Sequence, residues 1–174
     1  MDLALLALGA VVGLTFMAHG AQKLFGAFGG HGIDGTAGFF EQIGLRPGKL
    51  HAWAAGGAEF FGGLAIALGL VTPIAAAALI AVMTAAVLTV HLKNGFFATN
   101  QGYEFNLVLV AALFALSGAG AGNWSLDNAL GIDLAGVAWA LGALGAGLLG
   151  GIAAVAGGRF ASRDPRGQGH PTPA

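Results

Sequence analysis

The chain has 174 residues, of which 56% are hydrophobic, 9% are charged and 32 are glycines, and its mean hydropathy is +0.79. Soluble domains carry about 25% charged residues, so this composition predicts an integral membrane protein and excludes a disordered chain, which needs low hydrophobicity and high charge. The formal net charge of −1, with only seven lysine and arginine residues, offers no basic surface for nucleic acid.

Five segments are predicted to cross a bilayer as α-helices, since a transmembrane helix takes about 20 mostly apolar residues. In chain order they are residues 3–24, 52–70, 73–92, 105–120 and 134–158. Across the second and third, residues 60–90 form one stretch without charge that is too long for a single span. Because proline opens helices well, Val71, Thr72 and Pro73 mark the turn of a helical hairpin. The fifth segment is rich in glycine and alanine, which allow close helix packing in lipid.

The basic residues predict how these helices are oriented. With the C-terminus in the cytoplasm, all seven lie on the cytoplasmic side: Lys23, Arg46, Lys49, Lys93, Arg159, Arg163 and Arg166. The positive-inside rule therefore favours an external N-terminus and a cytoplasmic C-terminus. Residues 159–174 show no hydrophobic periodicity and are predicted to form a disordered cytoplasmic tail.

Six polar residues lie near the cytoplasmic ends of four predicted spans: His19, Lys23, Glu59, His91, Glu104 and Asn106. We expect them to converge on one layer of the bundle. Ionisable groups inside spans are costly and usually mark functional sites. Two interpretations stay open: Lys23 pairs with Glu59 or Glu104 and only holds the bundle in register, or the layer is a ligand or redox site.

Nine of the 12 phenylalanines flank the same layer: Phe25, Phe28, Phe39, Phe40, Phe60, Phe61, Phe96, Phe97 and Phe105. An aromatic wall beside a few convergent polar groups is typical of a small-molecule pocket. Phenylalanine also packs against short glycine and alanine helices, which is the structural alternative. A flat apolar headgroup with polar edges, such as a quinone, would fit the first interpretation.

The connection between the first two spans is long and rich in glycine. Within it, residues 38–45 form an amphipathic patch with two phenylalanines, an isoleucine and a leucine. This patch predicts either a short helix on the membrane surface or a lid over the polar layer.

A series of motifs follows in a specific order over residues 4–130. They are HGAQKLFG from His19, EFFGGL from Glu59 with LGLVTP from Leu68, His91 followed by GFF, GYEFNL from Gly102, and SLD from Ser125. This succession resembles the DoxX family of small bacterial membrane proteins. The resemblance implies a four-helix transmembrane bundle in the bacterial inner membrane, here residues 1–130, so residues 131–158 would add a fifth helix.

The resemblance also implies a function. Some members are linked to quinol oxidase or thiosulfate:quinone oxidoreductase activity, others to membrane redox defence complexes, and the family's polar set falls on the same six residues. We therefore expect a membrane subunit that binds a quinone-like molecule. Its expected catalytic residues are Glu59, Glu104 and His91, and its expected ligand-binding residues are His19, Lys23, Phe60, Phe61, Phe97 and Asn106.

The chain has no cysteine and no flavin motif, so electrons would come from a redox partner protein. Two other interpretations use the same features. His19 and His91 could ligate a haem, or bind a metal together with Glu59 and Glu104, although the adjacent Lys23 disfavours a cation. Alternatively, the protein is a non-catalytic scaffold subunit whose glycine-rich fifth span docks a partner or a second copy.

Overall fold

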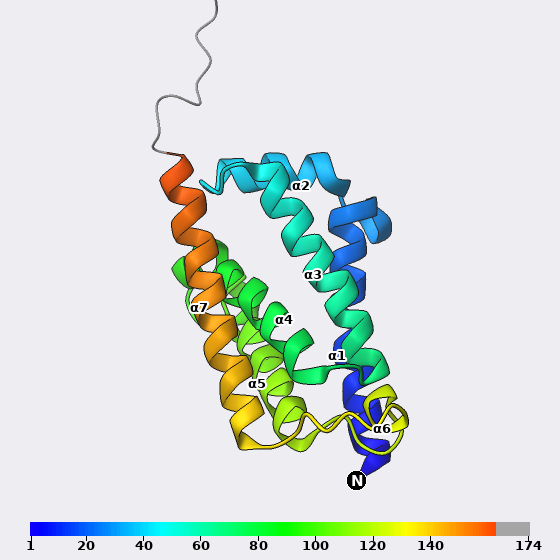
Figure 1. Cartoon of the computed structure of the whole chain (residues 1–174). Helices are drawn as coiled ribbons and strands as arrows, with labels where there is room; N and C mark the ends of the chain where they lie inside the picture. The colour runs from blue at the N-terminus through cyan, green and yellow to red at the C-terminus, as the bar shows by residue number, and fades with distance from the viewer. Residues whose placement is uncertain (163–174) are drawn as a thin grey trace, which may run out of the picture.

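The computed structural model describes residues 1–162, and this part of the chain contains helices and loops but no strand. Five long helices run in alternating directions (Figure 1): α1 (Asp2–Phe25), α3 (Gly48–Leu68), α4 (Thr72–Ala86), α5 (Glu104–Ala119) and α7 (Val137–Ala161). α4 continues through a π-helical turn, η2 (Val87–His91), and a 3-10 turn, η3 (Leu92–Asn94). Each of the five predicted spans coincides with a helix within a few residues of its expected limits.

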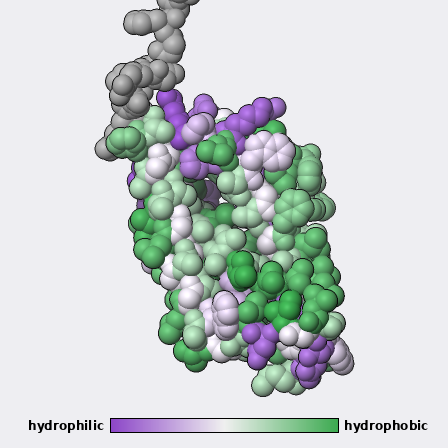
Figure 2. Space-filling view, viewed as in Figure 1, coloured by the Kyte–Doolittle hydropathy of each residue, from purple (hydrophilic) through white to green (hydrophobic). Residues whose placement is uncertain are grey.

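The bundle has the surface of a membrane protein. Three helices are long and apolar enough to cross a bilayer, namely Asp2–Phe25, Thr72–Asn94 and Val137–Ala161, and α5 is a shorter apolar helix. Figure 2 shows mostly apolar or neutral side chains along the bundle, with hydrophilic ones gathered at its two ends. The predicted all-α membrane bundle is therefore confirmed.

α1 and α3 pack closely because glycines lie where the two helices meet. A Cβ atom on Gly13 would lie 2.5 Å from the carbonyl oxygen of Gly63, and one on Gly63 would lie 2.6 Å from that of Gly13. A Cβ atom on Gly20 would collide with the backbone nitrogen of Phe60. This close contact runs along both helices and brings the end of α1 beside the middle of α3.

Substituting one of these glycines should therefore destabilise the bundle. We expect Gly63→Ala to lower the free energy of unfolding by about 1–3 kcal/mol, because backbone atoms must move to admit the methyl group. Gly57→Ala is the matched control on the same helix, since a Cβ atom there meets nothing within 4 Å and alanine favours the helix. Thermal denaturation in mild detergent compares the two; equal melting temperatures would contradict this account of the contact.

The long connection after α1 forms the turn η1 (Ala27–Gly29) and the helix α2 (Gly32–Gln42), which lies across one end of the bundle (Figure 1). The hydroxyl of Thr36 donates to the carbonyl oxygen of Lys23 at 3.3 Å, and Glu41 accepts from the Gly48 N–H at 3.3 Å. Residues 38–42 of the predicted amphipathic patch are the end of α2, and residues 43–45 follow it as a turn. Phe39 is exposed, whereas Phe40 lines a cavity between the helices.

α7 packs along α4 and α5, and its last turn is tied to the connection after α2. The carbonyl oxygen of Gly158 accepts from the Arg46 N–H at 3.2 Å, and the hydroxyl of Ser162 donates to Gly44 at 3.1 Å. Because α7 runs to Ala161, residues 159–161 of the predicted tail are helical. Residues 163–174, where the rest of that tail was predicted, lie outside the described residues.

The described basic residues share one end of the bundle. α1, η3 and α7 end there and α3 begins there, so the α2 end carries Lys23, Arg46, Lys49, Lys93 and Arg159. The charge asymmetry used to orient the helices is therefore present in the fold. Assignment of this end to the cytoplasm stays a prediction.

Candidate functional site

A cavity of about 350 Å³ lies between α1, α3, α4 with its continuation η2, α5 and the loop before α5. We call it the polar cavity, because five of the six predicted polar residues line it: His19, Lys23, Glu59, His91 and Asn106. Its apolar lining includes Phe16, Met83, Phe105 and Leu109. Residues from four separate helical segments and one loop therefore meet around one space near the α2 end.

An ion pair stands in the wall of this cavity. The Lys23 Nζ lies 2.5 Å from the Glu59 Oε2, and the two side chains are 24% and 2% exposed. A carboxylate so deeply buried needs a counter-charge, and Lys23 supplies it from the neighbouring helix. Of the two partners that the sequence left open for Lys23, the structure selects Glu59.

His91 donates a hydrogen bond to a loop carbonyl, and this bond defines the tautomer of a neutral ring. The His91 Nδ1 lies 2.7 Å from the carbonyl oxygen of Gln101, and because a carbonyl can only accept, Nδ1 is the donor. In a neutral imidazole this leaves Nε2 as a hydrogen-bond acceptor. His91 stands in the π-helical turn η2, and such irregular turns are frequent at functional sites.

Asn106 is buried in the cavity wall and makes a weak hydrogen bond. Its side-chain Nδ2 donates to the sulfur of Met83 at 3.3 Å. A thioether is a weak acceptor, so a ligand oxygen would be a better partner for this amide. Asn106 is therefore available to a ligand at little loss to the fold.

Glu104 does not line the polar cavity. Its Oε2 accepts from the backbone N–H of Ala98 at 2.8 Å, while Ala98, Gln101 and Gly102 cover one side of the cavity. The structure therefore gives Glu104 a role in holding the covering loop. Its predicted catalytic role is not supported by this position and stays a prediction.

Most of the phenylalanines predicted to flank the polar layer do not line the polar cavity. Phe61 and Phe97 are 64% and 63% exposed and do not line the polar cavity. Phe60 does not line it either; its ring packs edge-on against those of Phe25 and Phe61, with ring centroids 5.4 and 5.3 Å apart. These positions give the pocket interpretation no support for Phe60, Phe61 and Phe97, two of which lie on the outside of the bundle. The ligand-binding role of the three residues stays a prediction.

Sequence reasoning missed Phe16, Met83, Gln101 and Leu109 as lining residues. Helical spacing could have identified two of them. Phe16 precedes His19 by three residues and Leu109 follows Asn106 by three, so each shares a helix face with a polar residue of the cavity. Met83 and Gln101 carry no such signal.

A second cavity of about 350 Å³ lies between α3, α4 and α7, beneath Phe40 and Leu45. We call it the apolar cavity, since half of its lining residues are alanines and most of the others are apolar or shared with the polar cavity. It shares Lys23, Glu59 and Ala86 with the polar cavity. Figure 2 shows a hollow on this side of the bundle, in the region between α3 and α7 that Figure 1 displays.

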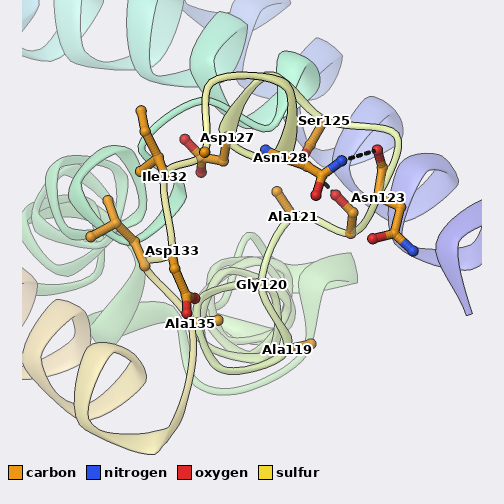
Figure 3. Close-up of a pocket in the computed structure, with 13 residues that line it drawn as sticks. Ala119, Gly120, Ala121, Asn123, Ser125, Asp127, Asn128, Ile132, Asp133 and Ala135 are labelled. Carbon is orange, nitrogen blue, oxygen red and sulfur yellow. Dashed lines mark hydrogen bonds between the residues drawn. The ribbon is translucent and has the colours of Figure 1, made fainter.

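A third cavity of about 360 Å³ lies at the opposite end, around the short helix α6 (Leu126–Ala129) (Figure 3). Its polar groups are largely occupied by local hydrogen bonds. The Asn128 side-chain amide donates to the Asn123 carbonyl oxygen at 3.0 Å, and Asp127 accepts from the N–H groups of Val71 at 2.8 Å and Thr72 at 3.3 Å. This cavity lies in the connection between α5 and α7, whose Asp127 binds the turn between α3 and α4.

Within residues 1–162, no three histidine, aspartate or glutamate side chains are grouped closely enough to hold a metal ion. The metal interpretation required His19, His91, Glu59 and Glu104 to meet, and Glu104 is engaged with Ala98 instead. The geometry therefore gives that alternative no support.

Known proteins resemble this chain over most of its length. The Bacillus subtilis (strain 168) protein named "Putative oxidoreductase CatD" is 30% identical over 118 residues, which cover 68% of this chain and 81% of the relative. "Uncharacterized membrane protein Rv3486" of Mycobacterium tuberculosis (strain ATCC 25618 / H37Rv) is 29% identical over 130 residues, which cover 69% of this chain and 77% of the relative. No solved structure matches the chain. The DoxX family profile matches residues 4–92, more than half of the chain, and the chain therefore belongs to the DoxX family.

Proposed function

We propose that this protein binds a quinone-like molecule in the polar cavity and works with a redox partner. The observation that carries the proposal is the meeting of the Lys23–Glu59 pair, His91 and Asn106 in a cavity with apolar walls. A few convergent polar groups in an apolar pocket are typical of small-molecule sites. The Bacillus relative is named a putative oxidoreductase, and this name supports a redox role.

The chemistry of the side chains suits a quinone. Its two ring oxygens accept hydrogen bonds, which Lys23 and Asn106 can donate, whereas Nε2 of His91 can accept one from a quinol hydroxyl. Reduction to the quinol takes two electrons and two protons. Glu59 and His91 are the groups that could move protons, and the electrons would come from the partner, because the chain contains no cysteine for an iron–sulfur centre.

The orientation follows from the shared end of the basic residues. In a bacterial inner membrane, the positive-inside rule puts the α2 end in the cytoplasm. The polar cavity lies near that end, so its protons would exchange with the cytoplasm. The partner would approach from the same side.

Binding is tested by thermal stabilisation in mild detergent with decylubiquinone as the probe. A ligand that binds the folded state raises its stability by RT ln(1 + [L]/Kd), so the wild-type melting temperature should rise with concentration. Asn106→Leu and His91→Ala should each weaken binding about threefold to tenfold, the effect of one lost hydrogen bond. Both variants should remain folded.

Trp139→Ala is the control, because Trp139 lies on α7 and lines neither cavity; it should bind as tightly as the wild type. If decylubiquinone does not stabilise the wild type at concentrations where a control lipid is also inert, the quinone proposal fails. A non-catalytic accessory role would then be the better interpretation.

A further inference from the structure

We infer that the apolar cavity holds the hydrocarbon chain of the same ligand, whose ring occupies the polar cavity. The ligand is then a neutral, membrane-soluble quinone with a prenyl or alkyl chain, and not a quinone ring without a chain. This inference rests on the proposed function and specifies its substrate class.

The two cavities are separated by a thin wall. Lys23, Glu59 and Ala86 line both of them, so one ion pair and one methyl group stand between the two spaces where the cavities adjoin. A ring that contacts the ion pair from the polar side therefore has the apolar cavity directly beside it. A chain attached to that ring has a short path into the second space.

The lining of the apolar cavity suits a hydrocarbon. Alanines from three helices face it, among them Ala54 on α3, Ala78 on α4 and Ala154 on α7. These short side chains leave the space between α3 and α7 unfilled, while both helices pack on α4. Its polar lining residues are Lys23, Glu59, His51 and Thr89; the first two pair with each other, and the Thr89 hydroxyl donates to the Ala85 carbonyl oxygen at 2.7 Å. Figure 2 shows apolar or neutral side chains below the hollow and hydrophilic ones above it, at the α2 end, so a lipid-soluble chain would enter from the apolar side.

The charges around the cavity favour a neutral head over an anionic lipid. Lys23 is the one lysine or arginine in its lining, and that ammonium is already paired with Glu59. A fatty-acid carboxylate or a lipid phosphate would therefore meet the buried Glu59 carboxylate, and His51 is the one other described lining residue that could carry a positive charge. A quinone ring presents neutral carbonyl oxygens to the same pair.

The test compares two ligands on two matched variants. The ligands are a dimethoxy-methyl-benzoquinone ring and the same ring with a chain of two isoprene units. Ala154→Phe is designed to fill the apolar cavity, and Ala153→Phe is the control, because both alanines are exposed on α7 but only Ala154 lines the cavity. Affinities are measured by thermal shift and by intrinsic tryptophan fluorescence in detergent micelles.

In the wild type we expect the ring with the chain to bind at least about tenfold more tightly than the ring alone, because each buried methylene adds several-fold to affinity. Ala154→Phe should remove this difference and leave the affinity of the bare ring unchanged. Ala153→Phe should behave like the wild type. Ala154→Leu, a smaller filling, should give an intermediate result and guards against misfolding of the Phe variant.

Two outcomes overturn the inference while the proposed function stands. One is equal wild-type affinity for both ligands, and the other is a chain advantage that Ala154→Phe and Ala154→Leu do not reduce. If neither ligand binds the wild type, the proposed function itself has failed. If an anionic fatty acid displaces the chain-bearing ring more effectively than the neutral alcohol of equal length, the cavity is a lipid site and the inference is wrong.

Discussion

Lys23→Met should lower the free energy of unfolding by about 3–5 kcal/mol, the usual effect of removing one partner from a buried ion pair. The Glu59 side chain is 2% exposed, so without Lys23 it must either stay charged in an apolar interior or take up a proton. Both alternatives are unfavourable. The loss is measured by thermal or SDS denaturation in mild detergent.

The double variant Lys23→Met with Glu59→Gln should recover much of this loss, because no buried charge is left. A control is available at the surface, where Lys49 Nζ lies 3.0 Å from Asp34 Oδ1 and the side chains are 65% and 83% exposed. Lys49→Met should change stability by less than about 1 kcal/mol. If the effects of Lys23→Met and Glu59→Gln simply add, the two residues are not coupled and the pair is not what stabilises this layer.

Asp127→Ala should cost about 2–3 kcal/mol of stability, the second-largest effect that we expect. Asp127 is buried, and its carboxylate accepts from the Val71 N–H at 2.8 Å, the Thr72 N–H at 3.3 Å and the Thr72 hydroxyl at 3.4 Å. The first N–H groups of a helix have no partner within it, and Val71, which precedes α4, has no side-chain acceptor. Asp127 therefore caps α4 from a distant segment.

Asp127→Asn should lose less than Asp127→Ala, because the amide oxygen can still accept one of these hydrogen bonds. Asp133→Ala is the control from the same connection, since Asp133 is exposed and lines the same end cavity. Amide hydrogen exchange at Val71 and Thr72 reports the cap directly and should accelerate in Asp127→Ala alone. Equal melting temperatures for Asp127→Ala and Asp133→Ala would exclude the capping role.

The choice of partner for Lys23 shows why sequence reasoning stopped where it did. Spacing along the chain placed Glu59 and Glu104 in the same layer, and nothing local distinguished them. The glycine contact between α1 and α3 brings Lys23 against Glu59, while the turn at residues 98–100 engages Glu104 through the N–H of Ala98. Both outcomes depend on backbone positions that no residue pattern specifies.

The phenylalanines show the same limit. Hydropathy indicates that an aromatic side chain leaves water, but in a membrane protein the outside of the bundle is as apolar as the inside. Phe61 and Phe97 therefore face outward without loss, while Phe16 lies fully buried in the cavity wall. Only the direction of each side chain on its helix separates a lining residue from a surface residue.

Residue patterns alone predicted the membrane class, the five long helices, the hairpin at Pro73 and the shared end of the basic residues. These features depend on local hydrophobicity, on proline geometry and on the charge of segments, which act over a few turns of helix. Three features were visible only in the folded bundle: the pairing of Lys23 with Glu59, the capping of α4 by Asp127, and the ion pair that lines two cavities. Those features arise from contacts between helices far apart in the chain. Helices are packed so closely that a shift by the size of one methyl group changes which side chains touch.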